Sequence, residues 1–404
     1  MRDFKRLPAG VRAVFRALQL QRPDPAQLSR MSDSEWEQAL RYCDRSHLTL
    51  ALAAGDANVP EWVRSHIDRA SAGASQRFEK MKAAYLEAAS AFQAAGIECA
   101  VLKGFAHVPQ FVPDVRLRMQ YDIDLFLAGD SVQSARDELI KLGYEPEKGF
   151  EQLPIDHLPP LVRKIPFEWN GDYFDPGIPV GFELHYRLWD HETERLEVPG
   201  LDAFWERRVM RDVEGIRFRS FGPADSVAYA ALHALRHLFR GDVRAGHFFE
   251  LARFLHASSR DTGFWLTWWD LHHPVLRELE AIVFSVAAEW FDCSTSAIVQ
   301  DQIAQLQPGI RRWIAVRGDA PLESAFHPNK EELWLHLSLL KSSRDQFAVA
   351  RRRLVPSRTN LHARQLRFNV SRLLHHLRTF CPALWSGVRW FAGSKRSSIS
   401  TISR

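Results

Sequence analysis

Hydrophobic positions along the chain repeat with two different periods, and the period changes twice. Residues 1–75 place apolar side chains three or four positions apart, and a longer helix is predicted from Gln76 to Ala95, ending at Gly96. From Pro223 onward the same helical period returns. Between these regions, short apolar stretches and strict alternation predict strands. The order helical, mixed, helical predicts an α+β protein.

The mixed region is predicted to contain strands, a helix and a hairpin. Strands are expected at 97–102, 122–127 and 179–186, a helix at 131–142, and a hairpin at 208–220 that turns at Glu214-Gly215. We therefore divide the chain into a helical region (1–75), a mixed domain (76–221), a helical domain (222–345) and a C-terminal segment (346–404).

Alternation in two of these strands brings carboxylates together. Side chains at positions i and i+2 of a strand point to the same face, so Asp122 and Asp124 share one face while Ile123 points into the core. In the strand at 179–186, Glu183 and His185 share a face in the same way. Three carboxylates at one cleft are the minimum set for two-metal phosphoryl or nucleotidyl transfer, so the sequence predicts such a site.

Five segments resemble, in order and spacing, the uncharacterised nucleotidyltransferases of the polymerase-beta superfamily. They are VLKGFAH (101–107), RMQYDIDLFL (118–127), LGY (142–144), FELHYRL (182–188) and LHALRH (232–237). The resemblance covers roughly residues 95–260. It implies a polymerase-beta-like mixed sheet with helical flanks. In that superfamily a glycine opens a helix that meets the nucleotide phosphates, and two aspartates bind magnesium.

The resemblance assigns roles to individual residues. Gly104 occupies the place of the glycine, Asp122 and Asp124 those of the aspartates, and Glu183 that of a third carboxylate. These three carboxylates would be the catalytic residues and would hold two Mg²⁺ ions. Replacing Asp124 by Asn is expected to abolish transfer and to leave the fold intact, because it relieves repulsion in an acidic site.

Basic residues near the predicted site are candidates for binding phosphate. Lys103, with Gly104, and Arg118 would bind the nucleotide, although Arg118 could instead pair with the aspartates. His185 would orient a metal ligand or act as a general base, the alternative being a purely structural hydrogen bond. The implied activity is transfer of a nucleoside monophosphate from an NTP such as ATP to an acceptor. The acceptor stays open: a small molecule, sugar, peptide, protein or RNA.

A second hypothesis is a binding or regulatory module that has lost turnover. Phe105 stands where the superfamily usually has Ser or Gly, and Tyr121 stands where a small residue is expected. Glu replaces the more usual Asp at position 183. Such a module would use its basic C-terminal segment to hold nucleic acid or an anionic membrane.

A histidine pair in the predicted helical domain has the spacing of a metal site. His233 and His237 are four residues apart, and His247 and Glu250 follow. That spacing can bind zinc. No HExxH motif is present, and the same face carries apolar residues. The favoured interpretation is that these side chains brace the helical domain against the transferase domain.

Charge and cysteine usage add two expectations. Twelve basic residues and no acidic residue follow Asp345, so with a net charge of +4 the remainder carries −8. This basic segment would either bind an anionic partner or dock on the acidic body.

The four cysteines form no CxxC pair, the N-terminus lacks a signal peptide, and the apolar stretch 281–299 is interrupted by acidic residues. These features favour a cytoplasmic protein without a transmembrane segment.

Overall fold

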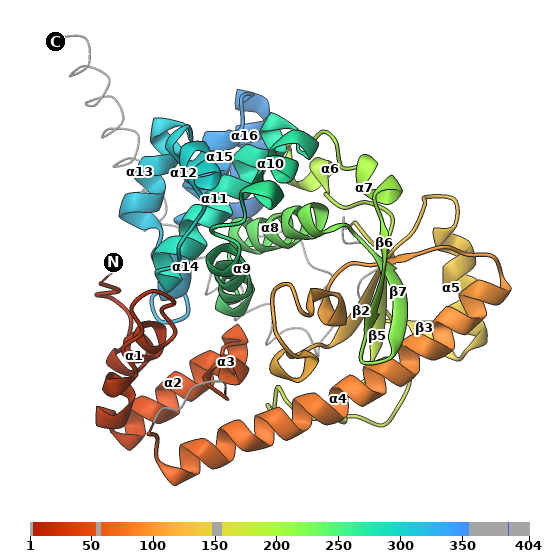
Figure 1. Ribbon diagram of the computed structural model, residues 1–404, viewed down its shortest axis with the longest axis horizontal. Helices are drawn as coiled ribbons and strands as arrows, with labels where there is room; N and C mark the ends of the chain where they lie inside the picture. The colour runs from red at the N-terminus through yellow and green to blue at the C-terminus, as the bar shows by residue number, and fades with distance from the viewer. Residues whose placement is uncertain (1–2, 54–57, 148–155, 355–386, 388–404) are drawn as a thin grey trace.

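The chain folds as an α+β structure with one mixed sheet covered by helices (Figure 1). This is a computed structural model, and it describes residues 3–53, 58–147, 156–354 and Gly387. The α+β class predicted from the sequence is confirmed. Among the described residues, no helix combines the length and the hydrophobicity needed to cross a bilayer.

The N-terminal region is helical, as predicted. It contains α1 (Ala9–Ala17), the 3₁₀ turn η1 (Pro25–Arg30), α2 (Asp33–Ser46) and α3 (Thr49–Ala53). Ser32 caps α2 in a reciprocal arrangement with Glu35, which satisfies two backbone donors at the start of the helix. His47 ends α2 in the left-handed conformation, with φ +62°.

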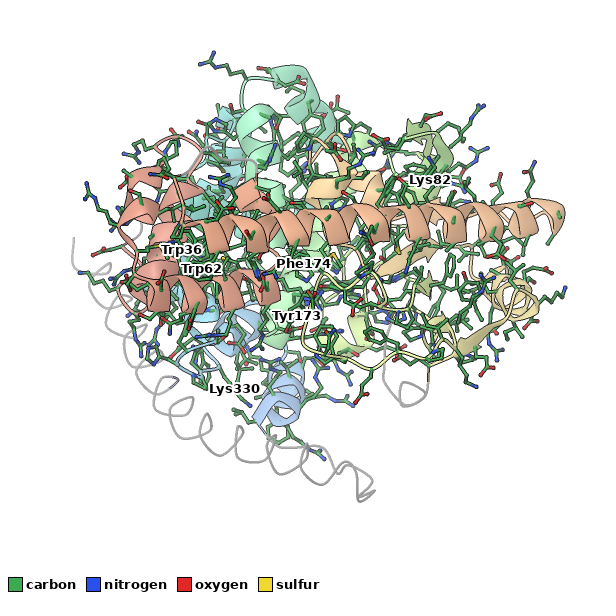
Figure 2. The ribbon with its side chains drawn as sticks, turned by 90° about the horizontal axis from the view of Figure 1, so that it is seen from below. Trp36, Trp62, Lys82, Tyr173, Phe174 and Lys330 are labelled. Atoms are coloured by element: carbon green, nitrogen blue, oxygen red, sulfur yellow. The ribbon has the colours of Figure 1, made fainter. Side chains whose placement is uncertain are left out.

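Helix α4 (Glu61–Ala94) is the longest element. It contains the helix predicted from Gln76 but begins earlier, directly after Pro60. Figure 2 shows α4 crossing the whole molecule, with Trp62 near its first turns, Lys82 in its second half and Phe174 beside its middle. One helix thus extends from the N-terminal helices to the far end of the sheet.

The sheet has seven strands in the order β3-β4-β5-β2-β1-β7-β6. The strands are β1 (Ala100–Val101), β2 (Asp122–Phe126), β3 (Tyr144–Pro146), β4 (Leu161–Arg163), β5 (Gly181–His185), β6 (Val209–Val213) and β7 (Ile216–Ser220). The pairs β2–β5 and β1–β7 are parallel, and the remaining pairs are antiparallel. The predicted hairpin is confirmed as β6–β7, and both Glu214 and Gly215 have positive φ, as its tight turn requires.

Short helices connect the strands, and a helical region follows the sheet. The connecting elements are η2 (Gly104–His107), η3 (Val115–Leu117), α5 (Val132–Lys141), α6 (His191–Glu194) and α7 (Ala203–Glu206). The later helices are α8 (Pro223–Arg240), α9 (Ala245–Ala257), α10 (Thr262–Leu271), α11 (Pro274–Phe291), α12 (Ala297–Ala304), α13 (Pro308–Arg317), α14 (Ala320–Glu323), α15 (Glu332–Leu339) and α16 (Ser343–Leu354).

Apolar side chains form two large cores. One is shared by the N-terminal helices and the helices from α8 onward, and the other fills the space between the sheet and helices α4 and α5. The apolar stretch 281–299 lies in the first core, where it forms the C-terminal part of α11 and the start of α12. The four-part division of the chain at 75, 221 and 345 remains a prediction.

Candidate active site

Two parallel neighbouring strands carry the predicted carboxylates. In the register of β2 and β5, Asp122 lies beside Gly181 and Asp124 beside Glu183. Because residues two apart share a face, Asp122, Asp124, Glu183 and His185 all project from the same side of the sheet. The opposite side chains, such as Ile123, are fully buried in the core against α4 and α5.

A buried arginine of α4 fixes the starts of both strands. The Arg77 guanidinium donates to the backbone carbonyls of Gln120 and Tyr121, just before β2, and to those of Ile178 and Pro179, just before β5. Its side chain is 1 % exposed. Arg77, which was not predicted from the sequence, thus reinforces the backbone ladder that aligns the two carboxylate-bearing strands.

Asp124 lies at the centre of a charged cluster. Its Oδ1 lies 3.0 Å from Lys103 Nζ and 3.1 Å from His185 Nε2. Glu183 Oε2 lies 3.5 Å from the same His185 nitrogen. Asp124, Glu183 and His185 offer ligand atoms within 4.8 Å of one another. Two of the three predicted carboxylates are thus in contact range of one ion, with His185 as their neighbour.

Asp122 faces the same cavity from the start of β2. It lines a space of about 200 Å³ together with Glu183, and its negative charge acts on the Glu183 carboxyl. Within the described ranges, its carboxylate forms no ion pair. It is therefore the carboxylate of the three that is free to accept a new ligand.

The protonation states follow from these contacts. Burial and the charge of Asp122 oppose ionisation of Glu183, but the hydrogen bond from His185 and the charge of Lys103 prevail and lower its pKa to about 2. Burial also opposes the charge on His185 and Lys103, yet the surrounding carboxylates raise the pKa of both well above the ordinary value. Two buried cations therefore balance the carboxylates in this structure.

Asp156 and Arg236 extend the cluster, and neither was predicted from the sequence as a site residue. Asp156 Oδ2 lies 3.5 Å from His185 Nδ1 and forms an ion pair with Arg236 of α8. Burial opposes the charge of Asp156, but Arg236 and His185 hold its pKa far below the usual range. Arg236 lies in the largely apolar stretch AYAALHALRHLF, and this position was the available signal for it. A charge that is buried in such a helix needs a partner.

Gly104 follows β1 and opens the 3₁₀ turn η2 rather than the helix expected there. Its φ is +71°, and a Cβ at this position would lie 2.1 Å from the Gln120 amide nitrogen. Only glycine fits without displacing Gln120. Phe105 packs into the core against Tyr85 and Phe218, so the side chain after the glycine does not enter the cavity.

Arg118 does not pair with the aspartates. Its Nε lies 2.9 Å from Glu250 Oε1 of α9, and His107 Nδ1 lies 2.8 Å from the other oxygen of Glu250. Burial opposes ionisation of Glu250, but Arg118 and His107 lower its pKa to about 2. The ion pair between Arg118 and the aspartates that the sequence left open is therefore wrong, because the partner of Arg118 is Glu250. Held by this ion pair, Arg118 lines the cavity.

The cavity has a basic rim and a larger neighbour. Besides the carboxylates, it is lined by Lys103, Arg118, Arg236, Arg240, Arg244 and histidines 47, 157, 233, 237 and 247. Arg240, Arg244, His47 and Tyr121 also line an adjoining cavity of about 1050 Å³. The arrangement places anionic ligands of a hard cation beside a basic wall, which suits a metal-bound polyphosphate.

Comparison with known proteins gives one match. A family model described as uncharacterised nucleotidyltransferase matches residues 32–292. Neither the curated proteins nor the solved structures contain a match to the chain.

Proposed function

The chain belongs to the uncharacterised nucleotidyltransferase family, and we propose that it transfers a nucleoside monophosphate from an NTP to an acceptor with the help of Mg²⁺. The observation that supports this most is the placement of Asp122, Asp124 and Glu183 on one face of two paired strands, beside a cavity that is also lined by basic side chains. The resemblance inferred from the sequence and the family match agree on the reaction class.

Oxygen ligands that face the cavity fit magnesium, which prefers carboxylates and keeps several waters. Asp122 and Glu183 would hold the ion, and Asp124 would join them when Lys103 turns from it toward a phosphate oxygen. When bound, the ion would stabilise charge on the attacking and leaving oxygens. His185, held between Asp124 and Asp156, would keep both carboxylates in their orientation.

Basic side chains would hold the triphosphate. Arg244 forms no ion pair with a described residue and lines both cavities, so its guanidinium is available for a phosphate. Lys103 and Arg118 project into the same space. Gly104 would let the phosphates approach the backbone of η2, because no side chain extends from it.

The larger cavity is the place that we propose for the acceptor. It meets the carboxylate cavity at Arg240, Arg244, His47 and Tyr121, so a group bound there could reach the nucleotide. Its wall contains aromatic rings as well as arginines: Tyr42, Tyr121, Trp169, Tyr173 and Phe239 with Arg45, Arg352 and Arg353. Such a lining favours an acceptor that carries negative charge and a flat apolar part.

The alternative of an inactive binding module has one structural observation in its favour. Asp124 is already neutralised by Lys103 and His185 without any ion. The concern raised by Phe105 is smaller, because that ring belongs to the core. The two functions differ in turnover, so a turnover measurement separates them.

The test is release of pyrophosphate by the full-length protein, measured across the four common NTPs and pools of candidate acceptors, with Mg²⁺ and with a chelator. Asp122→Asn should lower the rate by about 100-fold or more, because it removes the free ligand of the ion. Asp130→Asn, an exposed carboxylate in the loop after β2, is the matched control and should be silent. Equal rates for both variants would overturn the proposal. Mg²⁺-dependent NTP binding without pyrophosphate release would favour the binding module.

A further inference from the structure

Three histidines gather on the side of Lys103 opposite to the carboxylates. The ring centroids of His233, His237 and His247 lie 4.6, 4.8 and 5.3 Å apart in pairs. Each ring offers a nitrogen within 4.8 Å of the other two. Lys103 Nζ lies 3.5 Å from His233 Nε2 and 3.0 Å from Asp124 Oδ1, so it separates the two groups.

The helix pair α8–α9 accounts for this placement. His233 and His237 are one turn apart on α8, and the helix ends at Gly241 in the left-handed conformation. The chain then reverses, and α9 begins at Ala245 and carries His247 in its first turn. Gly246 lets the first turn of α9 approach the backbone of His47, because a Cβ at position 246 would lie 2.5 Å from the His47 carbonyl oxygen.

The distance between two ring nitrogens matches a metal site. His237 Nε2 and His233 Nε2 are 3.3 Å apart. Two nitrogens bound tetrahedrally at ~2.0–2.1 Å from zinc are separated by about 3.3–3.4 Å. The pair therefore already has the spacing of two ligands on one ion.

A hydrogen bond to the backbone leaves the lone pair of His237 directed toward His233. His237 Nδ1 lies 3.1 Å from the Asp242 carbonyl oxygen, which can only accept, so Nδ1 carries the proton and Nε2 the lone pair. Ligating histidines are commonly fixed by such a bond from the other ring nitrogen to a carbonyl. His247 Nδ1 is buried and has no hydrogen-bond partner among the described residues.

The rings are also in the protonation state that ligation requires. Burial is the main cause that lowers the pKa of all three, and neighbouring cations add to it, although Asp242 opposes the lowering at His237. Lys103 lowers the pKa of His233, and Arg244 lowers those of His237 and His247. Neutral imidazoles bind zinc, whereas imidazolium does not.

We propose that His233, His237 and His247 bind a zinc ion, with a fourth coordination position open to the cavity. Three protein ligands and an open position are the pattern of a zinc site that binds water or substrate rather than of a closed structural site. Lys103, Arg118, Arg236 and Arg244 face the same cavity, so an anionic fourth ligand, such as hydroxide or a phosphate oxygen, would balance their charge. The site is separate from the carboxylates that we propose for magnesium.

The experiment is metal binding by the full-length protein after chelator treatment, with Zn²⁺ followed by calorimetry and Co²⁺ followed by its visible absorption. The wild-type protein should bind one Zn²⁺ per chain, and Co²⁺ should give the intense bands of a four-coordinate site. His237→Gln and His247→Gln, made separately, should each weaken Zn²⁺ binding by about 100-fold or more. His191→Gln, an exposed histidine on α6, is the matched control and should bind as the wild type does.

Two outcomes would overturn the inference: wild-type protein that binds no Zn²⁺, or unchanged affinity in both glutamine variants. Circular dichroism of each metal-free variant would show that a loss of binding is not a loss of fold. Asp122→Asn separates this inference from the proposed function, because it should lower the rate of pyrophosphate release by about 100-fold or more and leave Zn²⁺ affinity unchanged. Loss of Zn²⁺ binding in Asp122→Asn would place the ion at the carboxylates and contradict the histidine site.

Discussion

Gly104, close to the carboxylates, has no room for a side chain. Replacing it by Ala places a Cβ at positive φ and against the side chain of Gln120. The backbone conformation alone costs ~1–2 kcal/mol. We expect Gly104→Ala to lower the free energy of unfolding in urea by at least that amount.

Two comparisons separate the causes of this loss. The double variant Gly104→Ala/Gln120→Ala should recover the steric part and keep the backbone part. Gly129→Ala has an open environment and no positive φ, so it should change stability by less than about 0.5 kcal/mol. Equal effects at Gly104 and Gly129 would contradict both the backbone cost and the steric cost assigned to Gly104.

Arg236 and Asp156 form a buried ion pair behind His185. Replacing Arg236 by Met removes the ion-pair partner of the buried Asp156 carboxylate and leaves His185 beside it, and breaking such a pair costs ~3–5 kcal/mol. Urea unfolding of Arg236→Met should show a loss of this size. Adding Asp156→Asn should restore part of it, because the stranded charge is removed. A double variant that is less stable than Arg236→Met would contradict this account.

The carboxylates could be predicted from the sequence, whereas their partners could not. Asp122, Asp124 and Glu183 follow from alternation in two short strands and from the family's motifs. Asp156 lies in a loop without any period, and it meets Arg236 only because the tertiary fold brings them together. The relief of repulsion predicted for Asp124→Asn is accompanied by a loss of attraction that the sequence did not indicate. Lys103 and His185 attract Asp124, so losing its charge also removes one of the carboxylate partners of each cation.

At the scale of elements, long periodic segments were predicted well and short ones were not. Helix α5 and the hairpin β6–β7 match their predicted positions closely. β1 has two residues instead of the six expected, because the ladders with β2 and β7 begin at Ala100 and end at Val101. Strands β3 and β4 have three residues each, too few to show alternation, and they were missed.

Helices α8, α10 and α11 share a buried polar network around His272. Its Nδ1 lies 2.9 Å from Glu280 Oε2, and its Nε2 lies 3.3 Å from Asp225 Oδ1. Trp268 donates to the other oxygen of Glu280, and Arg207 pairs with Asp225. Burial opposes protonation of His272, but Glu280 and Asp225 prevail and raise its pKa to about 9.

This network predicts a pH dependence of stability. The folded-state pKa of His272, about 9, lies above the unfolded value of ~6.5. The protonated ring therefore makes its full contribution to stability at pH values below the unfolded pKa. The contribution is lost as the pH rises through about 9. The stability difference between wild type and His272→Gln, from urea unfolding, should therefore be largest near pH 6 and shrink toward alkaline pH. A difference that does not vary with pH would contradict the assignment.

At the scale of the whole molecule, the first part of the predicted basic segment docks on the body. Val349 of α16 is buried, Arg353 pairs with Glu332, and Arg352 donates to the Thr193 carbonyl. This agrees with the structural role considered for the start of the segment. Its remainder, beyond Leu354, lies outside the described residues except for Gly387, so the anionic partner stays a prediction.

Two truncations distinguish these roles. Ending the chain after Asp345 removes the partner of the buried Glu332 and uncovers the site of Val349, which should cost roughly 3 kcal/mol or more and promote aggregation. Ending it after Leu354 keeps both contacts and should be much milder. Light scattering and thermal unfolding would measure this. A monomeric 1–345 protein with the wild-type melting temperature would contradict the structural role.

The 1–354 protein tests the other role. Loss of salt-sensitive RNA or vesicle binding in this protein would support an anionic partner.

Arg77 also has a kinetic consequence. Its guanidinium holds carbonyls at the starts of both β2 and β5, so neither strand can leave the sheet while that side chain stays in place. Amide protons on the two strands are therefore expected to exchange with solvent in a single cooperative opening, although the strands are far apart in the sequence. Asp122, Asp124 and Glu183 would be exposed in the same event, and the carboxylates would be lost and regained together.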